Sequence, residues 1–371
     1  MKFTCNQQAL AKALVTVSKA VSNRTTLPVL KGILINATEE GKLIFTASDL
    51  EISIKKEIEA VVEEPGSVVV MSKLFGDIIR KLPDETIAVS SEEDGSVLIK
   101  TSYSEFKVVS LPVEEFPSVG EKEEGSETVV FNGNIFKDMV RKTSFAASID
   151  ESKGVLTGIL TEINEEDIKM VSLDGFRLAL VKETMKSAKP SKFLISAKVM
   201  NEISKIVSDE EEDADINISL GTKKAVFNIG TTEVILRIME GEFIKYQDII
   251  PAENTTKVIA GRDVLLESIE RASLLAKEGK NNLIKITIKN ELMTITSRSE
   301  EGNVKEEIII EKTGNDIEIG FNSKFVIDVL KAIDDEKVSL NFKTGVSPCV
   351  VKPAEGDAYE YLILPVRIPT M

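Results

Sequence analysis

The chain has no histidine among its 371 residues and only two cysteines, Cys5 and Cys349. Without histidine, Ser-His-Asp triads and Cys-His pairs are excluded, and the commonest metal ligand of proteins is missing. Two cysteines so far apart in the sequence indicate neither a disulfide framework nor a zinc site. We therefore expect no metal and no cofactor.

Long apolar runs are also missing. No stretch of about 18 apolar residues predicts a transmembrane helix, and the N-terminal residues lack the apolar core of a signal peptide. With so few cysteines, this predicts a soluble protein of the reducing cytoplasm. The glycine-rich phosphate loop, the dinucleotide fingerprint and the Gly-x-Ser-x-Gly elbow are absent too. A binding or scaffolding role is favoured over an enzyme, although Lys, Asp or Tyr chemistry in an interdomain cleft stays open.

The composition is that of a soluble globular protein, with 42% hydrophobic and 29% charged residues. Its length corresponds to two or three ordinary domains. The 61 acidic and 46 basic side chains leave a formal charge of −15. Taken alone, this charge argues against a nucleic-acid partner, because the summed field repels phosphates. The position of the positive charge decides the question, however.

One charge pattern occurs three times, at intervals of about 125 residues. Its copies are Lys73-Asp77-Arg80, Lys198-Glu202-Lys205 and Lys324-Asp328-Lys331. On an α-helix, the three positions of a copy fall within a stripe about 60° wide. In the first copy, Leu74, Phe75, Ile78 and Leu82 are expected on the opposite side. Each copy therefore predicts an amphipathic helix with a packed apolar face and an exposed, net-positive ridge.

The rest of the chain repeats with the same period. Each copy begins with a predicted short strand and a helix, over residues 2–21, 129–148 and 257–277. Polar and apolar residues then alternate, which predicts antiparallel sheets with one covered face. Acidic segments with glycine or proline separate the copies. We predict three α+β domains, residues 1–124, 125–252 and 253–371, each with two helices packed on antiparallel sheets.

The basic ridges have two interpretations. A single ridge is most simply a solvated helix face with acidic partners three or four residues away. Three copies of one pattern instead favour a common target. If the domains form an arc with the ridges on its concave side, they would hold a polyanion by its backbone, without reading sequence. The first helix of each repeat adds further basic residues: Lys12, Lys19, Arg141, Lys142, Arg271 and Lys277.

Several segments carry a resemblance to a known family. They are Lys2-Phe3-Thr4, Thr26-Leu-Pro-Val-Leu30, Ala47-Ser-Asp-Leu-Glu51, Asp174-Gly-Phe-Arg-Leu-Ala179 and Tyr361-Leu-Ile-Leu-Pro-Val-Arg-Ile368. In their order and spacing, and over essentially the whole chain, the sequence resembles the bacterial DNA polymerase sliding clamps, the beta subunits of the replicative polymerase. The resemblance implies a non-catalytic processivity factor.

The resemblance also implies an assembly and partners. It predicts a head-to-tail homodimer of three-domain chains that closes into a ring around duplex DNA, independently of sequence. Short linear peptides of the replicative polymerase and the clamp loader would bind a groove between domains 2 and 3. Near DNA, the resemblance places Arg24, Lys73 and Lys198, and the internal repeat extends the set to Arg80, Lys205, Lys324 and Lys331. A monomeric protein-binding scaffold without DNA contact is the alternative.

Two further sets of residues follow from the resemblance. The peptide groove would comprise Leu156, Leu173, Gly175, Phe176, Arg177, Leu178, Ile249, Leu364, Pro365, Val366 and Arg367. The dimer interface would comprise Phe106, Leu274 and Leu275. For the apolar members of both sets, a place in the core of one domain is the alternative. The chain departs from many relatives at Phe176, where they have His, at Ile244, where they have Pro, and in its last three residues, 369–371.

Overall fold

The computed structural model describes residues 1–22, 25–120, 123, 125–186, 190–209 and 214–368. Contacts divide the chain into two compact units. Unit 1 comprises Met1–Phe136 and Glu202–Ile238, and unit 2 comprises Lys137–Asn201 and Met239–Met371. No helix in the described ranges is long and apolar enough to cross a membrane.

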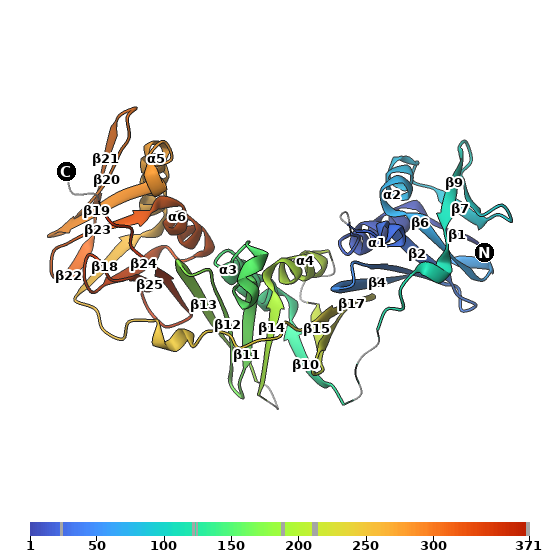
Figure 1. Ribbon diagram of the computed structural model, residues 1–371, viewed down its shortest axis with the longest axis horizontal. Coiled ribbons are helices and arrows are strands. Elements are labelled where there is room, and N and C mark those ends of the chain that lie inside the picture. The colour runs from blue at the N-terminus through green and yellow to red at the C-terminus, as the bar shows by residue number, and fades with distance from the viewer. Residues whose placement is uncertain (23–24, 121–122, 124, 187–189, 210–213, 369–371) are drawn as a thin grey trace. The chain divides into compact units, whose positions relative to one another are not determined.

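Unit 1 is built on one antiparallel sheet of thirteen strands, in the order β10-β15-β16-β17-β4-β3-β2-β6-β9-β8-β7-β1-β5. The strands from the first third of the chain are β1 (Lys2–Asn6), β2 (Gly32–Ala37), β3 (Lys42–Ser48), β4 (Ile52–Glu59), β5 (Val61–Glu64), β6 (Gly66–Met71), β7 (Thr86–Ser91), β8 (Ser96–Lys100) and β9 (Glu105–Leu111). The others are β10 (Glu127–Asn132), β15 (Asp215–Leu220), β16 (Lys224–Ile229) and β17 (Thr232–Arg237). Helix α1 (Gln7–Ser18) packs against α2 (Ser72–Lys81) and against β3 and β4 (Figure 1).

Unit 2 contains two antiparallel sheets. The nine-stranded sheet has the order β14-β11-β12-β13-β26-β25-β24-β18-β22, and the four-stranded sheet has the order β21-β20-β19-β23. Their strands are β11 (Gly158–Ile163), β12 (Asp167–Leu173), β13 (Arg177–Thr184), β14 (Ser191–Ser196), β18 (Thr256–Gly261), β19 (Leu283–Lys289), β20 (Leu292–Arg298), β21 (Asn303–Ile309), β22 (Glu311–Gly314), β23 (Ile317–Asn322), β24 (Lys337–Phe342), β25 (Cys349–Pro353) and β26 (Tyr359–Ile363). Helix α5 (Arg262–Ala276) packs against α6 (Ser323–Ala332) and against β19, β20 and β21. Helices α3 (Gly133–Ser144) and α4 (Ala197–Ser208) each contribute residues to both units.

Asparagine side chains start three of the helices. The side chain of Asn6 accepts a hydrogen bond from the backbone N–H of Ala9, at 3.1 Å. Asn132 and Asn322 cap α3 and α6 in the same way. Such caps satisfy N–H groups that have no partner inside the helix, and each contributes about 1 kcal/mol. The short polar residue before each apolar run thus fixes where these helices begin.

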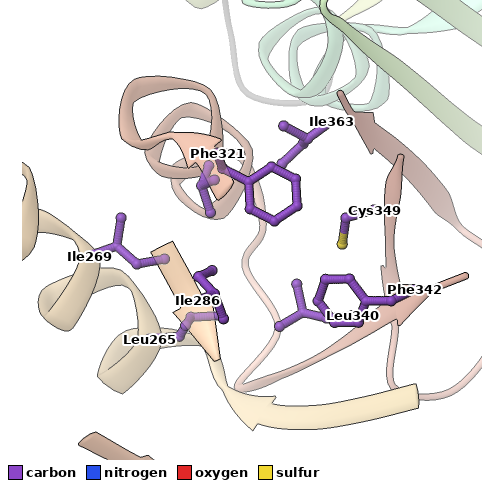
Figure 2. Close-up of a pocket in the computed structure, with 9 residues that line it drawn as sticks. Leu265, Ile269, Ile286, Phe321, Leu340, Phe342, Cys349 and Ile363 are labelled. Carbon is purple, nitrogen blue, oxygen red and sulfur yellow. The ribbon is translucent and has the colours of Figure 1, made fainter. Parts of the chain in front are cut away.

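The interior of unit 2 is packed with apolar side chains. A cavity of about 10 Å³ is lined by Leu265, Ile269, Ile286, Phe321, Val326, Leu340, Phe342, Cys349 and Ile363. Figure 2 shows the side chains around it. A lining without hydrogen-bonding groups offers a water molecule no polar partners, and the space is too small for a ligand. Burial raises the pKa of the Cys349 thiol beyond the range in which a reactive thiolate forms. This region is therefore core and not a binding site.

The predicted architecture is confirmed. Each third of the chain contributes two helices packed on antiparallel strands, and the three repeated charge patterns lie on α2, α4 and α6. One detail of the prediction was wrong: Leu74, expected on the packed face of α2, is 54% exposed. The buried face of α2 is formed by Ser72, Phe75 and Ile79. At 100° per residue, Leu74 lies about 120° from the centre of that face.

Candidate functional site

The basic ridges are exposed in all three repeats. Arg24 lies outside the described residues. The other six predicted residues are all exposed: Lys73 and Arg80 on α2, Lys198 and Lys205 on α4, Lys324 and Lys331 on α6. The opposite faces carry buried residues such as Phe75, Met200 and Val326. The amphipathic helices that the repeat predicts are therefore present.

Within each ridge, the two basic positions differ. The second residue of each copy is paired: Arg80 with Asp77, Lys205 with Glu202 at 2.7 Å, and Lys331 with Glu270 at 2.8 Å. The first residue of each copy, Lys73, Lys198 or Lys324, has no ion-pair partner within the part of the chain that the structure describes. Three unpaired ammonium groups at one repeat position are available to an external anion.

Most of the basic residues in or next to α1, α3 and α5 bind acidic residues of the same chain. Lys12 and Lys19 both bind Asp209, through its carbonyl oxygen and its carboxylate respectively. Arg141 and Lys142 share Asp138 and Asp334, and Arg271 forms a forked pair with Glu306. The hydrogen bond to Glu306 raises the pKa of Arg271, so it stays charged and paired. These residues mainly bind other parts of their own chain.

A tight turn between β12 and β13 displays the motif Asp174-Gly175-Phe176-Arg177. One carboxylate oxygen of Asp174 accepts hydrogen bonds from the backbone N–H groups of Phe176, at 2.8 Å, and Arg177, at 3.1 Å. Gly175 has a φ of 94°, in the region that residues with a Cβ rarely adopt. The Asp-Gly pair therefore dictates the turn, and the turn places Phe176 and Arg177 at the end of the hairpin.

Arg177 is held on several sides. It is only 9% exposed, and its guanidinium binds Asp174 at 3.1 Å and also Asp328 of α6. The guanidinium carbon lies 4.7 Å from the ring centre of Phe325 and 5.4 Å from that of Phe145. A buried arginine needs such partners, because an unpaired buried charge is costly.

Phe176 extends from the same turn and is 54% exposed. Its ring stacks on Phe325, with the ring centres 6.1 Å apart, and the Lys153 ammonium lies 5.6 Å from its ring centre. The backbone of Phe176 accepts a hydrogen bond from the N–H of Leu364, at 2.9 Å, and the N–H of Val366 donates to Gly320 at 2.8 Å. The C-terminal segment thus runs between the hairpin and β23. Pro365 is half-buried there, and Arg367 is exposed.

The predicted apolar groove residues divide into core and surface. Leu173 and Leu178 are buried in a cluster that includes Leu160 and Leu362, so the core alternative applies to them. Leu156 and Leu364 pack on this cluster while partly exposed. Ile249 is 38% exposed and lies outside the cluster. Five partly buried residues that were not predicted also pack on it: Val155, Leu180, Met239, Phe243 and Ile250.

Tyr246 anchors the segment that carries Phe243 and Ile250 to the rest of unit 2. It is buried in the same cluster, and its hydroxyl donates to Glu162 at 2.7 Å. Glu162 also binds Lys192 at 2.9 Å. Burial would raise the pKa of Glu162, but the hydrogen bonds from Lys192 and Tyr246 lower it below its ordinary value. Glu162 is therefore ionised at neutral pH and fixes Tyr246.

The predicted interface residues lie at two separate places. Phe106 lies on β9 and is 40% exposed. Residues 105–109 of β9 pair with β8 on one side. On the other side, no strand of the described residues pairs with them, because β6 pairs only with Ser110 and Leu111. Leu274 on α5 is 65% exposed, whereas Leu275 is half-buried. The core alternative therefore applies in part to Leu275 and not to Leu274. An open strand edge with exposed apolar groups is suited to pairing with another chain.

The described residues contain no group of three or more Cys, Asp or Glu side chains that could hold a metal ion. The other features described above are the exposed basic ridges, the hairpin whose Arg177 binds Asp174 and Asp328, and the open edge of β9.

Comparison with known proteins covers the whole chain. The N-terminal, central and C-terminal domain models of the DNA polymerase III beta subunit match residues 1–120, 131–245 and 247–367. The beta sliding clamp of Staphylococcus epidermidis is 36% identical over 378 residues, and the match covers 99% of each chain. Two crystal structures are similar throughout. One is a putative DNA polymerase III beta subunit from Eubacterium rectale (34% identity, TM-score 0.94, 99% of this chain and 100% of the other). The other is the DNA polymerase sliding clamp of Bacillus subtilis (30% identity, TM-score 0.95, 100% of both chains).

Proposed function

Because the chain belongs to the DNA polymerase III beta subunit family, we propose that two copies close head to tail into a ring around duplex DNA. The chain is a sliding clamp, a processivity factor and not a catalytic subunit. In the proposed ring each copy contributes three clamp domains, residues 1–124, 125–252 and 253–371. The ring acts in the cytoplasm, where its DNA is.

One observation carries the DNA contact: Lys73, Lys198 and Lys324 are exposed and have no ion-pair partner among the described residues. A chain with a net charge of −15 repels DNA unless its free positive groups face the phosphates. Lysines on long, mobile side chains suit a sliding contact, because a point charge imposes no fixed geometry on the phosphate. Arg80, Lys205 and Lys331 reinforce the field of each ridge.

The dimer interface supplies the ring closure. The open edge of β9 with Phe106 meets the partner's α5 face with Leu274. Strand β21 is also at the edge of its sheet, pairs only with β20 among the described strands, and ends at Ile309, which is 84% exposed. A heterologous contact of this kind generates a ring when its rotation closes. Two such interfaces hold each ring.

The hairpin and the C-terminal segment form the peptide-binding groove. Partly buried Leu156 and Leu364 and the exposed ring of Phe176 offer apolar contact, while the Arg177 guanidinium fixes orientation. A few polar groups set into an apolar surface suit short linear peptides. Such peptides of the replicative polymerase and the clamp loader are the proposed ligands.

The test is retention on DNA of two shapes. The chain is placed on a nicked circular plasmid by its cognate clamp loader and ATP, and bound protein is separated by gel filtration before and after the circle is cut. A ring stays on the circle and leaves the linear form by sliding off its ends. Equal retention on both forms would show ordinary DNA binding. No retention on either form, together with a monomer mass of 40.7 kDa, would favour the protein-binding scaffold.

A further inference from the structure

The acidic residue of the third ridge has a different kind of partner from its counterparts in the first two ridges. The acid of each ridge lies four residues after the first lysine: Asp77, Glu202 and Asp328. In the first two repeats it binds the basic residue three positions later on its own helix. In the third repeat Asp328 instead binds Arg177, which is 151 residues away in the sequence. Lys331, left without Asp328, pairs with Glu270 of α5.

The new partner lies in the predicted peptide groove. Arg177 is nearly enclosed, and the Asp174 and Asp328 side chains that bind it are only 14% and 26% exposed. Asp174 belongs to the same turn and moves with it. Asp328 belongs to α6, a helix that packs on α5, and is therefore an independent fixed point for the guanidinium. Without Asp328, the contacts of the Arg177 guanidinium within the described residues are the Asp174 carboxylate of its own turn and the rings of Phe145 and Phe325.

We propose that Asp328 is a positioning residue of the peptide groove: from within the basic helix α6, it holds the Arg177 guanidinium in the orientation that a peptide ligand meets. This inference rests on the proposed function of the groove. Asp328 itself does not contact the peptide. Its effect passes through Arg177, because removing one partner of a buried charge pair lets the remaining charge reorient toward solvent or other acceptors.

The test is fluorescence anisotropy of a labelled peptide that carries the clamp-binding segment of the cognate replicative polymerase. We expect Asp328→Asn to weaken peptide binding about tenfold, the loss of roughly one well-placed charged contact. Asp328→Glu restores the charge and should recover part of the affinity. Asp77→Asn is the matched control: it removes the same repeat position from α2, and peptide affinity should not change.

A double-variant comparison separates positioning from a general loss of structure. In an Arg177→Ala background, Asp328→Asn should cause no further loss of peptide affinity, because the residue it positions is gone. Melting temperatures of all variants identify any that are unfolded. Wild-type affinity in Asp328→Asn, or an equal loss with and without Arg177, would overturn the inference while leaving the groove intact. If the wild-type chain bound no peptide, the proposed groove itself would be wrong, and the inference with it.

Discussion

Replacing Leu274 by alanine should weaken the dimer without unfolding the monomer. Leu274 is 65% exposed in the isolated chain, so its burial energy is realised only when a partner covers it. Complete burial of a leucine contributes about 1.5–3 kcal/mol, so covering this exposed part contributes about 1–2 kcal/mol at each interface. A head-to-tail ring contains two interfaces. The variant should therefore lose about 2–4 kcal/mol of association free energy, a roughly 30- to 700-fold rise in the dimer Kd.

Sedimentation equilibrium over a range of concentrations measures that Kd directly. The matched control is Ile149→Ala, which removes a fully exposed aliphatic side chain of the same unit outside the proposed interface. Its Kd should equal that of the wild type. The melting temperature of the Leu274→Ala monomer should not fall, because the Leu274 side chain buries little apolar area within its own chain. An unchanged dimer Kd in Leu274→Ala would refute the placement of this interface.

Three other predictions concern unit 2, and one of them uses a comparison variant in unit 1. Deleting residues 364–371 should abolish binding of the polymerase peptide and leave the dimer mass unchanged; full affinity after the deletion would place the site elsewhere. Gly175→Ala should lower the free energy of unfolding by about 1–2 kcal/mol, because φ is positive at that position. Gly76 lies in the interior of α2 with open space around it, so Gly76→Ala should instead raise the free energy of unfolding by about 0.5–1 kcal/mol. The pKa of Glu162 is lower in the folded state than its ordinary value of 4.5, so the stability it contributes is complete above that pH and is lost as pH falls through the folded value. The gap in melting temperature between wild type and Glu162→Gln should accordingly stay constant from pH 7 to 5 and close below 4.5, and a gap independent of pH would contradict this role.

Local signals carried most of the fold prediction. The triplicate charge pattern located α2, α4 and α6, because side chains on one helix face recur at 100° steps whatever surrounds them. Alternation likewise predicted antiparallel strands. The turn at Asp174-Gly175 was not predicted from the sequence, although its φ of 94° at Gly175 favours glycine. The error at Leu74 has a local cause too: the ridge was located correctly, but an apolar residue on the flank of the helix was counted as part of its packed face.

What the sequence could not provide are contacts between distant segments. Strand β4 pairs with β17, with Thr232 opposite Lys56, and nothing in either strand specifies that partner. The Arg177–Asp328 pair is equally non-local. The sequence pattern of Asp328 is the same as that of Asp77 and Glu202, which pair with a basic residue of their own helix, so nothing in the sequence indicated a distant partner. Phe243 and Ile250 were missed because they lie in a segment without strand or helix periodicity, where burial depends on tertiary packing alone.

The central claim is that an acidic protein encircles DNA with its free lysines turned toward the phosphates. The most direct measurement is retention on nicked circular DNA of a variant with Lys73, Lys198 and Lys324 changed to glutamate, compared with a variant in which three exposed lysines of strands and turns, Lys223, Lys257 and Lys289, are changed likewise. The dimer mass should be the same for both. In low salt, the ridge variant should retain about tenfold less protein on the circle, with the deficit shrinking as added salt screens the repulsion, while the control stays close to wild type. Equal retention by the two variants would contradict the account.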